Sequence, residues 1–284
     1  MPTPAPVTAE PDAAHPGRRC AVLGSPIAHS LSPALHRAAY AELGLDWHYD
    51  RFEVIEAGLA GFVTNLDPSW RGLSLTMPLK AAALELGEVE PLAALAGAAN
   101  TVVLERDGRR RLHNTDIGGL VWALRRAGVP ALERATILGA GATARSTLVS
   151  LSRLGASHVV VVARTPARAA PLSALGTTLG LQVHVQAWTA TLPPSDAVLS
   201  TAVAGAADDL AEEAAASAPV VFDAIYDPWP TRLAEAATAA GRTLVNGLDL
   251  LVGQALLQLE LMTGSPVDPE VLYTAGRSAL AARA

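Results

Sequence analysis

The chain of 284 residues contains a single lysine, Lys80, among 21 basic residues, so the other twenty are arginines. A guanidinium stays protonated, whereas an ammonium can lose its proton near neutral pH when it is desolvated. Pro78 is predicted to begin a helix that places Lys80 in its first turn, where the helix dipole disfavours the charged ammonium. Lys80 is therefore a candidate proton donor and acceptor, unless a biased composition left one lysine by chance.

Two serines precede the predicted first helix in the segment Ser30-Leu31-Ser32-Pro33. Ser32 before Pro33 is typical of a helix N-cap followed by proline at the first helical position, and this interpretation needs no ligand. The same arrangement directs free N–H groups and two hydroxyls at one point, which would suit a small carboxylate. Ordinary capping residues also end or begin other predicted segments: Asn100-Thr101 and Asn114-Thr115-Asp116.

A glycine-rich loop, Gly139-Ala140-Gly141-Ala142-Thr143-Ala144, follows an apolar strand and opens a predicted helix. It matches the G-x-G-x-x-G/A pattern, whose glycines allow a tight turn and close approach of the backbone to a pyrophosphate. The next predicted strand ends at Arg164, Thr165 and Arg168, where NAD-binding proteins usually carry an acidic residue. Two guanidiniums and a hydroxyl favour a 2′-phosphate, and so NADP over NAD, although solvated surface arginines would give the same pattern.

Strands and helices alternate along the chain, which predicts an α/β protein with largely parallel sheets. Helices are predicted from Pro33 to about Leu43, from near Asp116, and twice after Gly247. The predicted strands are Arg19–Gly24, Trp47–Val54, Gly72–Thr76, Ala135–Leu138, Val159–Ala163, Ala197–Ser200, Val220–Phe222 and Thr243–Val245, with a hairpin joining Thr101–Glu105 to Arg109–His113.

Composition excludes several classes of protein. The formal net charge of −6 argues against a nucleic-acid or polybasic membrane partner, and no apolar run approaches the ~18 residues of a membrane span. Cys20, the one cysteine, is expected to be a buried thiol in a reducing compartment. The first seventeen residues lack a cationic start and an apolar stretch, which predicts a disordered tail and a cytoplasmic protein.

Eight motifs follow one another between Arg19 and Gly264, and in this order they resemble the shikimate dehydrogenase family. The motifs are Gly24-Ser-Pro-Ile-Ala-His-Ser30-Leu-Ser32-Pro33, Thr76-Met-Pro-Leu-Lys80, Gly97-Ala-Ala-Asn100-Thr101, Asn114-Thr115-Asp116, Gly139-Ala-Gly-Ala-Thr-Ala-Arg145, Arg164-Thr165, Asp223-Ala-Ile-Tyr226 with Pro228 and Thr231, and Gly247-Leu-Asp-Leu-Leu-Val-Gly-Gln254. Single motifs are weak signals, but eight in order are specific.

The resemblance implies an enzyme that reversibly reduces 3-dehydroshikimate to shikimate with NADPH, on the route to chorismate and the aromatic amino acids. It implies that Lys80 and Asp116 form the acid–base pair and that Ser30 and Ser32 hold the substrate carboxylate. Further pocket residues would be Thr76, Asn100, Asp116, Tyr226 and Gln254. The dinucleotide would contact Gly139, Ala140, Gly141, Ala142, Thr143, Ala144, Arg164, Thr165, Arg168 and Gly247, the last near the nicotinamide.

The expected architecture has two domains behind the tail of residues 1–17. An N-terminal α/β substrate domain covers 18–115, joined by the C-terminal helices 248–284. A Rossmann domain that binds NADP covers 116–247. The expected ligands are small molecules, with no nucleic acid, membrane or metal partner, and the protein would be a monomer or homodimer.

Some positions depart from the family pattern. Ser74 replaces an asparagine two residues before the pocket threonine, a supporting position. Three changes bear on the coenzyme: Ala163, Ala142 in place of the third glycine, and Ser200-Thr201-Ala202. The Ser-x-Ser pattern favours shikimate, because relatives that also use quinate tend to carry threonine at the second position.

Three alternatives remain open at this point. One is a quinate/shikimate dehydrogenase that uses NAD, which the arginines after the second Rossmann strand argue against. Another is a non-catalytic shikimate-binding paralogue, which should have lost Lys80 or Asp116. A metal enzyme is the third, but the histidines show no ligand spacing. Of these, His29 and His113 are interpreted as supporting or turn residues, and the others as solvated: His15, His36, His48, His158 and His184.

Overall fold

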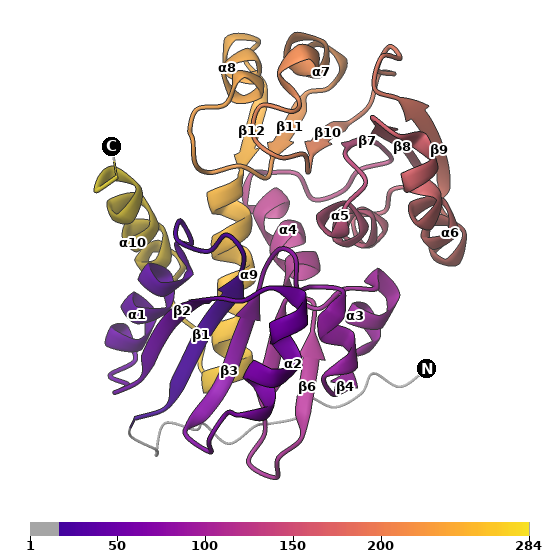
Figure 1. Cartoon of the computed structure of the whole chain (residues 1–284). Coiled ribbons are helices and arrows are strands. Elements are labelled where there is room, and N and C mark those ends of the chain that lie inside the picture. The colour runs from indigo at the N-terminus through magenta and orange to yellow at the C-terminus, as the bar shows by residue number, and fades with distance from the viewer. Residues whose placement is uncertain (1–16, 284) are drawn as a thin grey trace.

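The computed structural model describes residues 17–283, so the predicted tail lies outside the described residues except for Gly17. The strands form two six-stranded sheets, one from the first part of the chain and one from residues 134–246 (Figure 1). The predicted α/β class is therefore confirmed.

The first sheet contains β1 (Arg19–Gly24), β2 (His48–Glu53), β3 (Trp70–Leu75), β4 (Glu88–Val89), β5 (Thr101–Leu104) and β6 (Arg110–His113). Their order is β2-β1-β3-β5-β6-β4. β1 pairs in parallel with β2 and β3, whereas β3 pairs antiparallel with β5. The predicted hairpin is confirmed as the antiparallel pair β5–β6.

The second sheet contains β7 (Arg134–Leu138), β8 (His158–Ala163), β9 (Gln182–Ala187), β10 (Ala197–Ser200), β11 (Val220–Asp223) and β12 (Thr243–Asn246). All neighbouring pairs in the order β12-β11-β10-β7-β8-β9 are parallel. The order reverses between β7 and β10, which is the switch point where such sheets bind dinucleotides. β9, an edge strand whose valines alternate with polar residues, was not predicted from the sequence.

Helices cover both faces of each sheet (Figure 1). The first sheet packs against α1 (Ser32–Glu42), α9 (Gly247–Thr263) and α10 (Pro269–Ala281) on one face and against α2 (Glu56–Thr64) on the other. The second sheet packs against α4 (Thr115–Arg126), α5 (Ala142–Arg153) and α6 (Ala170–Leu179) on one face and against α7 (Ala211–Ser217) and α8 (Arg232–Ala239) on the other. The remaining α-helix is α3 (Pro91–Ala96).

Helices α4 and α9 carry the chain between the two sheets and pack closely against each other. A Cβ atom on Gly119 of α4 would lie 2.5 Å from the backbone nitrogen of Gln254 in α9, and one on Gly253 would lie 2.5 Å from the Gly119 carbonyl oxygen. Only glycine allows the helix backbones to approach this closely. The crossing therefore sets the position of Gln254 relative to the start of α4.

Two buried side chains test expectations from the sequence. Cys20 is fully buried, as predicted, and burial raises its pKa to about 11. The prediction that His36 is solvated is wrong: the imidazole is fully buried, stacks on Tyr49 with ring centroids 4.0 Å apart, and donates from Nδ1 to the Ser32 carbonyl at 2.9 Å. Burial lowers its pKa to about 4.

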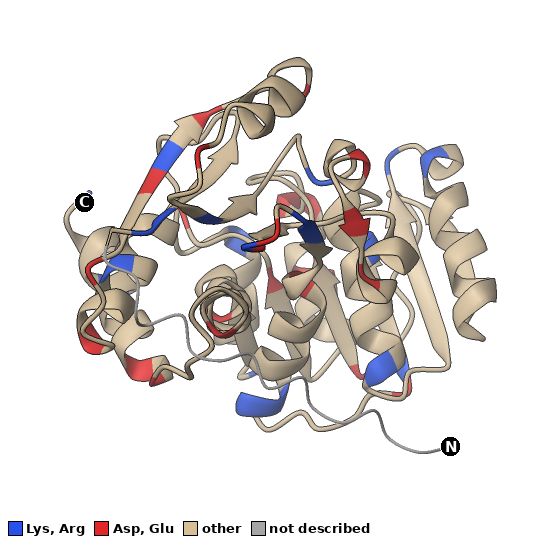
Figure 2. Cartoon of the chain, turned by 90° about the horizontal axis from the view of Figure 1, so that it is seen from below, with Lys and Arg blue, Asp and Glu red and all other residues tan. Residues whose placement is uncertain are grey.

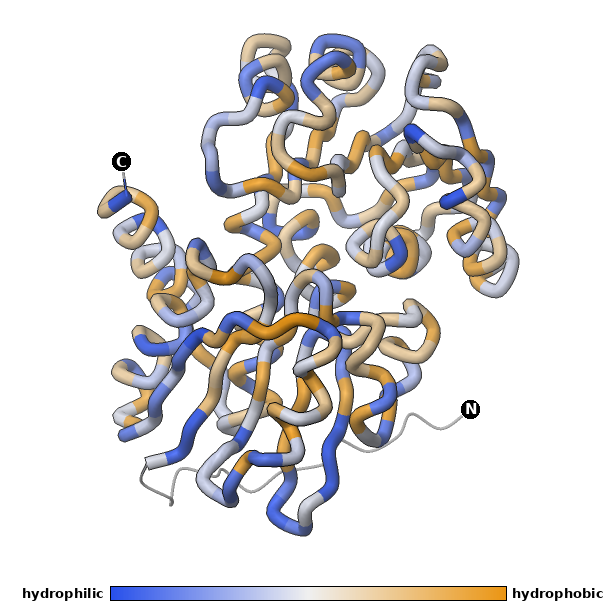
Figure 3. The backbone as a smooth tube through the Cα atoms, in the orientation of Figure 1, coloured by the Kyte–Doolittle hydropathy of each residue, from blue (hydrophilic) through white to orange (hydrophobic). Residues whose placement is uncertain are grey.

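The surface mixes both charge signs. In Figure 2, acidic and basic residues are interspersed along the described chain. The loops at the end of the first sheet farthest from the second are mostly hydrophilic (Figure 3). Among residues 17–283, no helix is both long and apolar enough to cross a membrane.

Candidate active site

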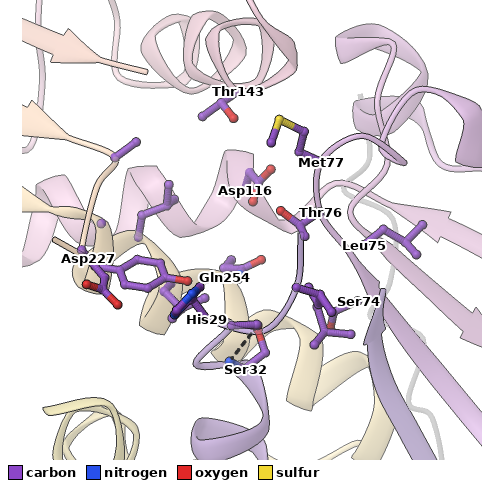
Figure 4. Close-up of a pocket in the computed structure, with 18 of the residues that line it drawn as sticks. His29, Ser32, Ser74, Leu75, Thr76, Met77, Asp116, Thr143, Asp227 and Gln254 are labelled. Carbon is purple, nitrogen blue, oxygen red and sulfur yellow. Dashed lines mark hydrogen bonds between the residues drawn. The ribbon is translucent and has the colours of Figure 1, made fainter. Parts of the chain in front are cut away.

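A cavity of about 400 Å³ lies between the two sheets, at the carboxyl ends of β1, β3 and β11. Ligands of open α/β sheets bind at such edges, where helix N-termini also supply free N–H groups. Eight residues with a predicted role line the cavity together with Thr143 of the glycine-rich loop: Ser30, Ser32, Thr76, Lys80, Asp116, Tyr226, Gly247 and Gln254. Figure 4 shows Ser32, Thr76, Asp116, Thr143 and Gln254 among the residues around it.

Lys80 and Asp116 form an ion pair at the wall of this cavity. Lys80 Nζ lies 2.6 Å from Asp116 Oδ2, and the two side chains are 14% and 8% exposed. Asp116 is in the first turn of α4, where the helix dipole favours its negative charge. A shielded ammonium held by one carboxylate oxygen can donate a proton to a ligand oxygen. The resulting amine can then take up a proton again beside the carboxylate.

The predicted helix beginning at Pro78 is wrong. The Lys80 carbonyl accepts a hydrogen bond from the Ala99 N–H at 2.8 Å, a partner from outside any local helix. Residues 77–81 form turns, and a short 3₁₀ helix begins only at Ala82. The charge partner of Lys80 is therefore the Asp116 carboxylate, and no helix dipole acts on the ammonium in the way the sequence suggested.

Asn100 lies directly beneath the ion pair and is almost fully buried. Its Oδ1 accepts from the backbone N–H of Thr115 at 2.8 Å, which fixes the orientation of the amide. Its Nδ2 therefore donates to Asp116 Oδ1 and to Gln254 Oε1, each at 2.8 Å. Asn100 thus orients two cavity residues and, unlike them, is not part of the cavity lining.

The two serines lie at the start of α1. The helix begins at Ser32 and its N-cap is Leu31, without a side-chain hydrogen bond, so the prediction of Ser32 as N-cap is wrong by one position. Ser30 Oγ accepts from the Ser32 N–H at 3.3 Å (Figure 4). Both serines line the cavity at a helix N-terminus, which is the arrangement expected of a carboxylate site.

Tyr226 is held by a loop that follows β11. At the end of that strand the buried Asp223 accepts from Thr231 Oγ1 at 2.6 Å and from Ile225 N–H at 3.2 Å, and burial raises the pKa of Asp223. Burial likewise raises the pKa of Tyr226, so its phenol stays protonated and can donate a hydrogen bond into the cavity.

The glycine-rich loop has the geometry of a phosphate cradle. Gly139 follows β7 with φ of +112°, a left-handed conformation in which a Cβ would also lie 2.7 Å from Thr201 Oγ1. Helix α5 begins at Ala142, and its N-cap, Gly141, offers no side chain to cap the first N–H groups. These donors are therefore free for an anion, and Ala142 in place of the third glycine lies inside the helix.

Arg164, Thr165 and Arg168 are exposed beyond the carboxyl end of β8 and do not line the cavity. Arg164 precedes, and Arg168 lies within, a 3₁₀ helix over Pro166–Ala169. Within residues 17–283, neither guanidinium has a carboxylate within ion-pairing distance. Both are therefore available for an anionic group bound beside the β8 edge.

The cavity also includes residues to which the sequence analysis gave no binding role: His29, Ser74, Met77, Ile225, Asp227 and Leu250. Each lies within four positions of a predicted site residue, so its place in a motif was the only available signal. Met77 faces Thr143 across the cavity, between the segment after β3 and the glycine-rich loop (Figure 4).

Known proteins resemble this chain along most of its length. A family model described as "Shikimate dehydrogenase substrate binding domain" matches residues 22–102. Shikimate dehydrogenase (NADP(+)) of Sphingopyxis alaskensis is 36% identical over 252 residues, which cover 86% of this chain and 90% of that protein. The corresponding enzyme of Thermus thermophilus is 37% identical over 272 residues, which cover 92% of this chain and 98% of that protein.

Solved structures give the same result. The crystal structure of Mycobacterium tuberculosis shikimate dehydrogenase superposes with a TM-score of 0.86 at 42% identity, covering 92% of this chain and 99% of that one. A Thermus thermophilus shikimate 5-dehydrogenase crystallised with NADP(H) and shikimate gives a TM-score of 0.79 at 34% identity, covering 92% and 99%.

Proposed function

The chain belongs to the shikimate dehydrogenase family, and from this premise we propose that it catalyses the reversible, NADP-dependent reduction of 3-dehydroshikimate to shikimate. The observation that carries the proposal is the Lys80–Asp116 pair in a cavity that also holds two serines at a helix N-terminus. This arrangement supplies a proton donor and a carboxylate anchor within one enclosed space.

The substrate carboxylate would bind the hydroxyls of Ser30 and Ser32 and the N–H groups at the start of α1. Gln254 would donate from its amide nitrogen to a substrate hydroxyl, because its oxygen already accepts from Asn100. Anchoring the ring at both ends fixes which carbon faces the glycine-rich loop.

When bound, NADPH supplies the hydride for the C3 carbonyl. Lys80 would then stabilise the developing alkoxide and transfer a proton from Nζ to that oxygen, and Asp116 would hold the ammonium in place. In the direction of oxidation, the same pair would remove the proton. Positioned acid–base groups of this kind contribute roughly 10²–10⁴-fold to the rate.

NADP fits the residues at the second sheet. The uncapped N-terminus of α5 and the backbone at Gly139 would hold the pyrophosphate, and Arg164, Thr165 and Arg168 would bind the 2′-phosphate. We assign residues 116–247 to this dinucleotide domain. Residues 18–115 and 248–284 would form the substrate domain, because α9 and α10 share a hydrophobic core with β1 and α1.

Initial rates with shikimate and with quinate, each with NADP and with NAD, test the proposal. We expect the highest kcat/KM for the shikimate–NADP pair. A preference for quinate with NAD would identify the alternative catabolic dehydrogenase and overturn the proposal. Absence of turnover with all four pairs, despite shikimate binding, would identify a non-catalytic binding protein.

A further inference from the structure

A continuous set of hydrogen bonds runs beneath the cavity, from Tyr49 on β2 to Asp116 on α4. We propose that Gln258, supported by Ser74, is a positioning residue that fixes the orientation of Asn100 and Gln254 and thereby of Asp116. The inference rests on the proposed function, since these three residues would act on shikimate.

Gln258 is a fully buried amide in the otherwise apolar middle of α9, one turn after Gln254. Its Nε2 donates to Thr101 Oγ1 at 2.9 Å, and its Oε1 accepts from Ser74 Oγ at 2.9 Å. Burying a side-chain amide costs free energy unless its groups are paired. Both groups of the Gln258 amide are paired: the nitrogen with Thr101, next to Asn100, and the oxygen with Ser74.

Two backbone groups, the Thr115 N–H and the Asn100 carbonyl, fix the orientations of the buried Asn100 and Gln258 amides. Thr115 N–H can only donate, so Asn100 Oδ1 must be an acceptor, and it also accepts from Thr101 Oγ1 at 2.9 Å. Gln258 Nε2 lies 3.4 Å from the Asn100 carbonyl oxygen, which can only accept, so the nitrogen side of this amide faces Asn100 and Thr101. The Gln258 oxygen must then face Ser74, whose hydroxyl donates to it.

The amides of Asn100 and Gln258 orient the cavity residue Gln254. Its Oε1 receives Asn100 Nδ2 at 2.8 Å and Gln258 Nε2 at 3.4 Å, which leaves its own amide nitrogen for a ligand. A reversed Gln258 amide would place its oxygen against the Asn100 carbonyl oxygen and Gln254 Oε1, which are both acceptors. Gln258 therefore selects the Gln254 orientation that presents donors to a ligand.

The set continues to the other end of the cavity through Tyr49. The fully buried Tyr49 hydroxyl donates to Ser74 Oγ at 2.6 Å. The Tyr49 ring stacks on His36, whose Nδ1 donates to the Ser32 carbonyl at 2.9 Å. Ser74, predicted to be a supporting position, thus joins Tyr49 to Gln258, and Tyr49 packs against the side chain that holds the Ser32 carbonyl. Apart from Asp116, which begins the proposed dinucleotide domain, these side chains lie in the substrate half, and none of the hydrogen bonds of the set reaches the glycine-rich loop of residues 139–144.

The test compares Gln258→Met with Thr263→Val, a matched control on the same helix. Thr263 is also buried, and its hydroxyl donates to the Leu259 carbonyl at 2.7 Å, but it does not touch the set. We expect Gln258→Met to lower kcat/KM for shikimate by about 10- to 100-fold, the effect of one unpaired buried group, with the KM for NADP within about twofold of wild type. Thr263→Val should lose a comparable amount of unfolding free energy but keep the wild-type kcat/KM for shikimate and KM for NADP.

Gln258→Glu separates hydrogen-bond direction from packing, because glutamate has the same shape as glutamine. In this variant the ionised carboxylate cannot donate to Thr101, whereas the protonated acid can. We expect Gln258→Glu to resemble Gln258→Met at pH 8 and to recover activity, relative to wild type, as the pH falls. Adding Ser74→Ala to Gln258→Met should cause little further loss, because the two residues act as a unit.

Each outcome decides the question. If wild-type protein oxidises shikimate and Gln258→Met matches Thr263→Val, the positioning role is wrong and the proposed function stands. If wild-type protein does not oxidise shikimate, the proposed function and the positioning role of Gln258 are both wrong. If Gln258→Met lowers kcat/KM equally for shikimate and for NADP, and Gln258→Glu does not recover activity at low pH, Gln258 is a structural residue only.

Discussion

At the cavity wall, Lys80 combines two properties that no other basic residue of this chain can supply together. It is shielded from solvent, and its single nitrogen meets one oxygen of Asp116 at 2.6 Å. An arginine would present a planar fork that stays protonated, so it could preserve charge without delivering a proton. Charge and proton transfer can therefore be separated by substitution.

Lys80→Ala should lower kcat by roughly 10²–10⁴-fold, with a much smaller change in the dissociation constant for shikimate. Lys80→Arg keeps the positive charge and should remain nearly as slow as Lys80→Ala. Steady-state kinetics together with calorimetric binding of shikimate measure both effects. Turnover close to wild type in either variant would contradict the acid–base assignment.

His36 should make stability depend on pH. Its pKa is lowered to about 4 by burial, from an ordinary value of about 6.5, so between these values the unfolded chain binds a proton that the folded protein does not. The stabilising effect is complete above pH 6.5 and is lost as the pH falls toward 4.

We expect the free energy of unfolding to fall by about 2 kcal/mol between pH 7 and pH 5 through His36 alone. Urea denaturation at the two pH values measures this change. His36→Phe should lack this part of the decrease, whereas His48→Phe, at an exposed position, should retain it. An equal decrease in wild type and His36→Phe would assign the pH dependence to other groups.

Lys80 and Asp116, predicted from the sequence as a pair, lie 2.6 Å apart, but the contacts that orient them were not predicted. Motif order predicted Lys80 and Asp116, yet the helix proposed around Lys80 was wrong, because the Ala99 N–H that captures its carbonyl is distant in sequence. Gln258 carried no signal, since one polar residue in an apolar helix does not reveal its partners on β3 and β5.

At the scale of elements, the close crossing of α4 and α9 makes Gly119 sensitive to substitution. A methyl group there would meet the Gln254 backbone at 2.5 Å, and neither helix can yield without moving the site. We expect Gly119→Ala to destabilise the protein by about 1–3 kcal/mol and to lower kcat/KM. Gly61→Ala, in α2 with nothing within 4 Å, should instead stabilise by about 0.5–1 kcal/mol. Denaturation and kinetics of both variants distinguish contact from helix propensity.

The segment after β8 should determine the choice between the two dinucleotides. Arg164→Ala should raise the KM for NADP at least about tenfold through the lost 2′-phosphate contact, and should leave the KM for NAD nearly unchanged. Arg153→Ala, at the far end of α5, provides the control. Equal changes for both dinucleotides would show that Arg164 does not recognise the phosphate.

Most elements of the fold were predictable because their hydrophobic patterns are regular. The buried strands β7, β8, β10 and β11 read as apolar runs, and the hairpin was marked by Asp107-Gly108. Among the elements that were missed, α2 has a mixed, glycine-containing sequence, α3 has only six residues, and β9 is an edge strand with no buried position. Tertiary packing, and not local sequence, defines these.

Across the whole molecule, a few side chains connect the two halves. Arg145 of α5 donates to the Gly97 carbonyl at 2.7 Å. Arg283 donates to the His29 carbonyl at 3.0 Å and to Asp227 Oδ2 at 3.1 Å. His29 and Asp227 belong to different halves and both line the cavity, so Arg283 holds two of its walls together.

Arg283→Ala should therefore act on the cavity more than on stability. The ion pair is partly exposed, so we expect less than about 1 kcal/mol of lost unfolding free energy. The KM for shikimate should rise severalfold, because the walls that carry Ser30 and Tyr226 lose a common anchor. Arg277→Ala, which removes an exposed ion pair on the preceding helix α10, should leave the KM unaltered.

The lone lysine makes this enzyme suited to chemical footprinting. Lys80 carries the only side-chain amine, so a mild acylating reagent that modifies the folded protein at a lysine must report on the cavity. Its rate of acylation should fall when shikimate covers the site, and intact mass spectrometry would count occupied molecules directly. A homologue with surface lysines offers no such readout without prior engineering.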